Sequence, residues 1–143
     1  MAELRKGPLV SLLILLLWGA TGPHFMISLD KEAYAQEERP ELTVRNIGLM
    51  PIELGRGYLL YRWDNGSWVR VRTGLIFTDD LIVLTPFRSW KQRITLKYLP
   101  ENESIGDPRF YPDLPPGRYK VVKEICGWPR GCVNASMEFE IAD

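Results

Sequence analysis

Past residue 25, apolar and polar residues alternate in short runs that are separated by Pro, Gly and Asn. A period of two is the pattern of a strand with one buried face, and no window past residue 25 has the 3.6-residue period of an amphipathic helix. This spacing predicts an all-β, antiparallel sandwich of seven or eight strands. The predicted strands are residues 25–30, 41–46, 58–63, 67–72, 81–84, 90–96, 118–125 and 133–141. The long connection at residues 100–116 is expected to be a surface loop.

One predicted hairpin places aromatic residues on a single face. If Asn65-Gly66 is a two-residue turn, Trp63 lies opposite Trp68 and Tyr61 lies opposite Arg70, while aliphatic residues occupy the other face. With the aliphatic face in the core, the aromatics would be exposed and suited to stacking on sugars or anchoring a protein partner. The alternative is that a bulge shifts the register and buries the Trp pair in the core.

The first 22 residues differ in composition from the rest. Arg5 and Lys6 precede residues 8–20, in which Ser11 is the only polar side chain, and small residues follow at 19–22. This order is typical of a secretory signal peptide, and the apolar run is shorter than the 20 or so residues of a comfortable membrane span. We therefore expect a signal peptide or an uncleaved signal anchor at 1–22, forming a leader helix ahead of one domain at 25–143. Any membrane contact is expected through this leader alone.

Charge and length narrow the classes of partner. The chain has 143 residues, enough for one domain, and its 18 basic residues balance 18 acidic ones. No charge excess or basic cluster favours nucleic acid, so a nucleic-acid partner is not expected.

Three of the four Asn residues begin Asn-x-Ser sequons, which are acceptors for N-glycosylation on exported proteins. They are Asn65, Asn102 and Asn134. Asn65 also fits the tight turn described above, so we favour the turn at Asn65 and the acceptor role at Asn102.

Cys126 and Cys132 are the two cysteines of the chain, and they flank a loop with two Gly and one Pro. Such a loop brings its ends close enough for a disulfide, which an oxidising compartment would maintain. Zinc is the competing interpretation, but it needs about four ligands and the chain adds only His24. We therefore expect no metal. The closed loop would present Trp128 and Arg130 to a partner, or else Trp128 covers the end of the sandwich.

Catalysis is not expected. His24 is the single histidine and lies beside the predicted leader, so a Ser or Cys nucleophile has no histidine base within the domain. No Gly-x-Ser-x-Gly elbow is present, and the sequence carries no cofactor motif.

A Leu-x-Pro-Gly-x-Tyr motif at residues 114–119 resembles the tyrosine corner of immunoglobulin-like folds, with Gly117 and Tyr119 as its structural residues. Together with Asp30-x-x-x-Tyr34 and the Leu-x-Val-x-Asn-x-Gly pattern at 42–48, the order of elements is similar to the bacterial and archaeal immunoglobulin-like domain family. Its members are typically attached to exported or surface proteins. The resemblance implies an immunoglobulin-like sandwich without catalytic residues. The chain departs from this pattern in the insert after Leu99 and in the cysteine-closed loop.

Two function classes follow. The first is a secreted or cell-surface module for binding or structural spacing, which recognises a glycan, an envelope polymer or a protein. The second is an inhibitor, because the pattern also resembles immunoglobulin-like proteinase inhibitors that block proteases with a loop. Exposure of the Trp63 and Trp68 pair would favour the first class.

Overall fold

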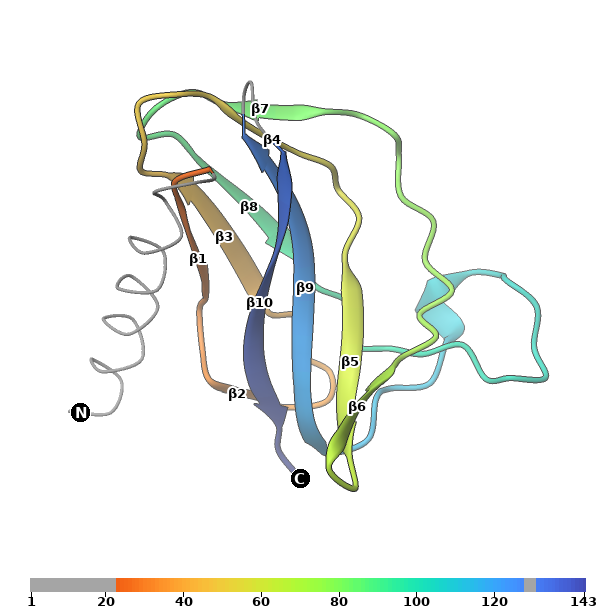
Figure 1. Cartoon of the computed structure of the whole chain (residues 1–143). Helices are drawn as coiled ribbons and strands as arrows, with labels where there is room; N and C mark the ends of the chain where they lie inside the picture. The colour runs from red at the N-terminus through yellow and green to blue at the C-terminus, as the bar shows by residue number, and fades with distance from the viewer. Residues whose placement is uncertain (1–22, 128–130) are drawn as a thin grey trace.

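The computed structural model describes residues 23–127 and 131–143, which form strands and one short 3₁₀ helix, η1, at Pro108–Phe110 (Figure 1). The strands are β1 (Phe25–Leu29), β2 (Ala33–Tyr34), β3 (Glu41–Asn46), β4 (Ile52–Leu54), β5 (Leu59–Asp64), β6 (Ser67–Arg70), β7 (Ile82–Leu84), β8 (Ser89–Arg93), β9 (Gly117–Gly127) and β10 (Cys132–Ile141).

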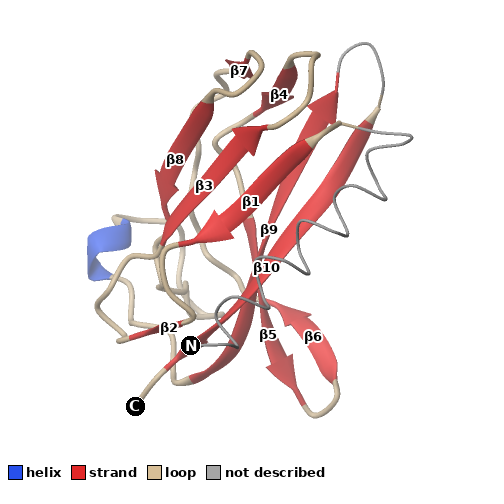
Figure 2. Cartoon of the chain, turned by 90° about the vertical axis from the view of Figure 1, so that its left-hand side faces the viewer, coloured by secondary structure: helices blue, strands red, loops and turns tan. Residues whose placement is uncertain are grey.

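Two sheets form the sandwich. The smaller sheet has the order β1-β3-β8, and the larger has the order β2-β10-β9-β4-β7, with β5 paired to β9 and β6 paired to β5. Figure 2 shows the two layers and the β5–β6 hairpin extending past them. The neighbouring strands are antiparallel except for β2, which pairs with β10 in parallel through Tyr34 and Ile141. The predicted all-β class and sandwich are confirmed, with this one parallel pair as an exception.

The core lies between the sheets and is built from the inward positions of each strand. β3 contributes Leu42 and Val44 from one side, while β9 contributes Tyr119, Val121 and Ile125 from the other, and each of these side chains is fully buried. The period-two alternation of the sequence therefore marks the buried face correctly.

Two strands escaped the sequence analysis. β2 has two residues and β4 has three, which is too short for an alternating pattern to be recognised. β4 nevertheless matters, because Ile52 and Leu54 are buried and the strand pairs with both β7 and β9. In chain order, ten strands replace the expected seven or eight within the described residues.

The start of β9 has the geometry of a tyrosine corner. Tyr119 is fully buried, and its Oη donates a hydrogen bond to the carbonyl oxygen of Pro115 at 2.6 Å. Gly117, two residues before it, has a φ of 154°, which L side chains rarely adopt. The Tyr119 ring stacks on Phe139 of β10 with centroids 5.9 Å apart. In the Asp30-x-x-x-Tyr34 pattern, the Tyr34 hydroxyl donates a hydrogen bond to Asp30 Oδ1 at 2.6 Å.

The connection at 100–116 is more structured than a plain surface loop. It contains η1, and a bridge joins Lys97 to Asp113 across its base. Tyr111 and Leu114 from this segment are buried, while Arg72 donates hydrogen bonds to the carbonyl oxygens of Pro100, Glu101 and Glu103. The alternation did not reveal these anchors because they are isolated residues.

The predicted leader at 1–22 lies outside the described residues. Within the described ranges, no helix has the length and apolar character that a membrane span requires.

Candidate functional site

The β5–β6 hairpin has the predicted register. Asn65 and Gly66 form the turn with φ values of 47° and 89°, both positive as a type I′ turn requires. Trp63 pairs with Trp68, and their ring centroids lie 5.1 Å apart with an interplanar angle of 67°. Trp63 is 37% exposed and Trp68 is half-buried. The alternative in which a bulge buries this pair in the core is therefore wrong.

The hairpin is more exposed than its sequence suggested. Leu60 near the base of β5 is fully buried, but Val69 on β6 is exposed although it lies on the aliphatic face. The reason is that the hairpin tip extends beyond the sandwich, as Figure 2 shows, so the second sheet does not cover it. The aromatic residues lie on the opposite face of the hairpin, and this face continues onto the outward positions of β9, the strand that pairs with β5.

β9 supplies two cations to the aromatic face. Tyr61 pairs with Lys120 across β5 and β9, and Arg118 lies two residues earlier on the same face. The Arg118 guanidinium lies 5.1 Å from the Trp63 ring centroid and 5.5 Å from that of Trp68. The Lys120 Nζ lies 4.7 Å from the Trp68 centroid and 5.3 Å from that of Tyr61. We call these five residues, Tyr61, Trp63, Trp68, Arg118 and Lys120, the aromatic–cationic cluster.

The cluster carries positive charge that is only partly neutralised. Arg118 Nε donates to Glu138 Oε1 at 2.8 Å, so this cation is paired. Lys120 and Arg70 form no ion pair among the residues that the structure describes, although Glu138 is the cross-strand neighbour of Lys120. Arg70 lies directly opposite Tyr61 at the edge of the cluster. At an exposed site, each cation–π contact of this kind has a favourable interaction free energy of about 0.5–1 kcal/mol.

An open groove of about 1040 Å³ continues from Arg70 along the larger sheet. Its walls are the outer face of β9, the connection between β4 and β5, and the segment that leads from β6 toward β7. Apolar residues of that segment, including Leu75 and Phe77, form one side, and Glu124 and Asn134 lie at the other. No local pattern in the sequence indicates this groove, because its walls come from segments that are distant along the chain.

A buried lysine also escaped the sequence analysis. Lys123 is fully buried between the sheets, and its Nζ donates to the carbonyl oxygens of Gly55 at 2.7 Å and Gly57 at 2.8 Å. Gln92 Oε1 lies 3.2 Å from the same nitrogen, whose charge also lies 5.0 Å from the Trp90 ring centroid. Burial lowers the pKa of Lys123 to about 8, and the neighbouring Arg56 guanidinium adds to this effect. The alternation of Val121 and Ile125 was the signal that residue 123 faces inward.

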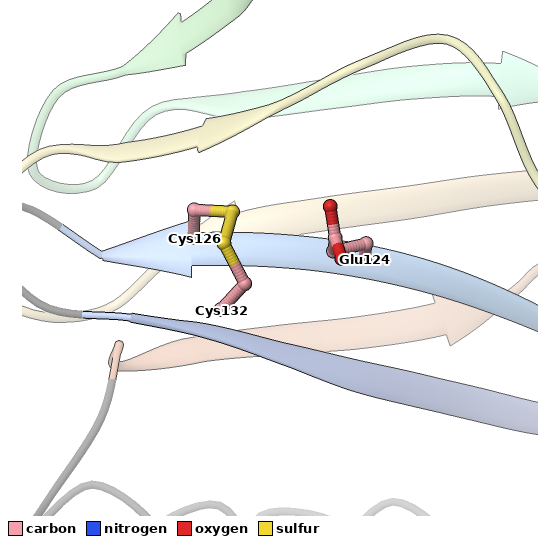
Figure 3. Close-up of side chains that lie close together, drawn as sticks. All are labelled: Glu124, Cys126 and Cys132. Carbon is pink, nitrogen blue, oxygen red and sulfur yellow. A yellow bond between two sulfur atoms is a disulfide. The ribbon is translucent and has the colours of Figure 1, made fainter.

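The predicted disulfide between Cys126 and Cys132 is present. The two residues are direct cross-strand partners in β9 and β10, with Cα atoms 4.0 Å apart. Figure 3 shows Glu124 beside them, and the potential ligand atoms of the three residues lie within 4.8 Å of one another. Because both sulfurs are joined, they offer no thiolate to a metal ion. The group then presents a single carboxylate.

The predicted glycosylation sites lie apart from one another and outside the aromatic–cationic cluster. Asn65, Asn102 and Asn134 are all exposed, at the hairpin turn, in the insert and on the outer face of β10. Asn134 also borders the groove. Trp128 and Arg130 lie outside the described residues.

Comparison with known proteins identifies the sandwich. The sequence model of a family described as "bacterial Ig-like domain" matches residues 21–140. No curated protein matches the sequence. Among solved structures, the chain is similar to β-glucosidase from Listeria innocua in complex with glucose, with 12% identity and a TM-score of 0.42, over 85% of this chain and 16% of that one. The same enzyme with isofagomine gives 13% identity and a TM-score of 0.40, over 83% and 16%. The chain thus spans about a sixth of the length of these structures.

Proposed function

Since the chain belongs to the bacterial Ig-like domain family, we propose that it is an exported, non-catalytic module that binds a negatively charged carbohydrate polymer through the aromatic–cationic cluster. Export is supported by the charged, apolar and small-residue order of residues 1–22 and by the three sequons. The disulfide supports it further, since such bonds persist in oxidising compartments. A cell-surface or secreted location would give the module access to envelope polymers.

The observation that carries the proposal is the partly exposed Trp63–Trp68 pair with two cations beside its rings. Paired aromatic rings that remain partly accessible at a sheet surface are typical of binding sites, where one part of the ring packs and another contacts a ligand. Their rings offer flat apolar surfaces that match the apolar faces of pyranose sugars. The contacts with Arg118 and Lys120 hold the charges in place, so less side-chain entropy is lost when a ligand binds.

The positive charge at the cluster favours acidic over neutral carbohydrates. Arg70 and Lys120 form no ion pair among the described residues, so their charges can bind carboxylate or phosphate groups of a ligand. A neutral glycan would use the rings but leave these cations without a partner. An acidic polymer uses both, and its attraction would weaken as salt screens the charges.

The groove supports an extended ligand instead of a single sugar. It begins at Arg70, which borders the cluster, and continues past Val122 to Asn134. A polymer lying along this line would contact the cluster at one end and the groove at the other. Glycosylation of Asn134 would place a bulky group at the far end of this path.

The proteinase-inhibitor alternative depends on Trp128 and Arg130, which lie outside the described residues. The cluster is composed entirely of described residues, and so it is the site on which the proposal rests.

Affinity electrophoresis tests the proposal with two gels, one containing polygalacturonate and one containing a neutral β-glucan. We expect retardation in the acidic gel, decreasing with added salt and lost in the double variant Trp63→Ala/Trp68→Ala. Phe110→Ala is the matched control, because Phe110 is an exposed aromatic outside the cluster. Equal migration of wild type and double variant in both gels would overturn the proposal.

A further inference from the structure

Two loops lie side by side at one end of the sandwich, residues 47–51 between β3 and β4 and residues 85–88 between β7 and β8 (Figure 1). The Phe87 N–H donates to the Asn46 carbonyl oxygen at 2.8 Å, and the Asn46 N–H donates to the Arg88 carbonyl oxygen at 2.9 Å. These bonds fix the two loops against each other.

Asn46 holds both loops from beneath. Its side chain is fully buried, and Nδ2 donates to the carbonyl oxygens of Met50 at 2.8 Å and Leu84 at 2.9 Å. Its Oδ1 accepts from the Gly48 N–H at 2.9 Å. A satisfied, buried amide of this kind makes the loop conformation specific, so the side chains above it are presented in a defined arrangement.

The residues presented there are apolar and exposed. Leu49 is 83% exposed, Met50 49% and Phe87 61%. We call these three residues the apolar rim. Phe87 has a φ of 68°, a conformation that is strained for a bulky side chain and that Gly or Asn would adopt at lower cost.

Charge within the two loops is sparse and positive. Residues 46–52 and 82–88 contain one charged side chain, Arg88, which is exposed. An apolar surface with a basic neighbour suits the interface of a bilayer that contains anionic lipid.

The chain also enters the sandwich at this end. Phe25 at the start of β1 pairs with Asn46 at the end of β3, so residues 23 and 24 lie beside the two loops. Four residues, 21–24, separate the apolar run at residues 8–20 from Phe25. The five steps from Ala20 to Phe25 span at most about 18 Å. If the run is held in a bilayer, the apolar rim is the part of the domain closest to it.

We propose that the leader stays in the bilayer and that the apolar rim inserts into the lipid interface beside it, so that the domain stands on the membrane through two contacts. The leader supplies the tether and raises the effective concentration of the rim at the surface, so three apolar side chains are sufficient. The aromatic–cationic cluster lies on the hairpin at the opposite end of β9 and therefore faces away from the membrane (Figure 1).

Photolabelling of the full chain tests this placement. The chain is reconstituted into phosphatidylcholine and phosphatidylglycerol vesicles with a photoactivatable phospholipid, and tryptic peptides are analysed by mass spectrometry. We expect lipid adducts on the leader peptide 7–31 and on peptides 46–56 and 73–88, which carry the rim. Peptide 110–118 contains Phe110, which is 82% exposed on η1 away from the rim, and it should stay unlabelled.

The variant Leu49→Ser/Phe87→Ser should lower the labelling of both rim peptides by about tenfold and leave the leader peptide unchanged. Labelling of the leader without labelling of the rim peptides above the level of peptide 110–118 would overturn the proposal. Equal labelling of the rim peptides in wild type and variant would also overturn it.

Discussion

The Tyr119 hydroxyl donates to the Pro115 carbonyl oxygen at 2.6 Å, and this bond fixes the start of β9 immediately beside the two cations of the cluster. Tyr119 faces the core, while its neighbours Arg118 and Lys120 face outward to the Trp rings. The corner thus links the stability of the sandwich to the position of the binding site, since both depend on where β9 begins.

Removing this hydroxyl should destabilise the protein modestly. Tyr119→Phe keeps the buried ring but leaves the Pro115 carbonyl without its donor, so we expect the free energy of unfolding to fall by about 1 kcal/mol. Urea denaturation measures the change. Tyr61→Phe, at an outward tyrosine of the cluster, is the matched control and should stay within about 0.5 kcal/mol of wild type. A loss at Tyr61 as large as that at Tyr119 would contradict the role given to the corner.

Lys123 should make stability rise with pH. Its pKa is lowered to about 8 in the folded protein from 10.5, so between these values the unfolded chain binds more protons. Deprotonation of Lys123 in the folded protein removes the cost of burying its charge. The contribution of Lys123 to the free energy of unfolding therefore increases as pH rises from about 8 to 10.5, and it is constant below about pH 7.

The variant Lys123→Met isolates that contribution. Burial raises the pKa of Tyr58 and Tyr119, which lowers stability at high pH, but this effect is present in both proteins. The free energy of unfolding of wild type should therefore rise relative to that of Lys123→Met between about pH 8 and 10.5. Lys120→Met, which removes an outward lysine of the same strand, is the matched control for the loss of one lysine. A flat difference for Lys123→Met would contradict the lowered pKa.

The disulfide should contribute a small, reductant-sensitive stability. It closes a short loop between adjacent strands, so Cys126→Ala/Cys132→Ala should lower the free energy of unfolding by about 2 kcal/mol. Wild type treated with dithiothreitol should approach the variant, whereas the variant should not respond. A response of the variant to dithiothreitol would show that the reagent acts elsewhere.

Gly74 should not tolerate a side chain. Its φ is 61°, and a Cβ there would lie 2.8 Å from Leu99 Cδ2 and 2.9 Å from Leu99 Cβ. Gly74→Ala combines backbone strain with overpacking, and we expect a loss of about 2–4 kcal/mol by urea denaturation. Gly55→Ala is the matched control, since a Cβ at Gly55 would have no neighbour within 4 Å, and it should be close to neutral. Similar losses at both positions would contradict the contact with Leu99.

The sequence predicted those parts of the fold that depend on local pattern. The Asn65-Gly66 turn determines the register that pairs Trp63 with Trp68, and both facts follow from residues close in the chain. The disulfide followed in the same way from a short loop with turn residues.

What was missed depends on contacts between distant segments. No local pattern indicates that β9 lies beside β5, so Arg118 and Lys120 could not be assigned to the aromatic face. Lys123 occupies an inward position of an alternating strand, but its carbonyl acceptors come from the connection between β4 and β5. The groove has the same origin, because its two walls meet only in the folded chain.

The role of the Trp pair is tested most directly by isothermal titration calorimetry with a soluble oligogalacturonate on wild type, Trp63→Ala, Trp68→Ala and the control Phe110→Ala. We predict binding by wild type and by Phe110→Ala with the same affinity, and a loss of about tenfold or more for each Trp variant. Equal affinity for all four proteins, or no binding by wild type, would contradict the assignment of Trp63 and Trp68 as the binding site.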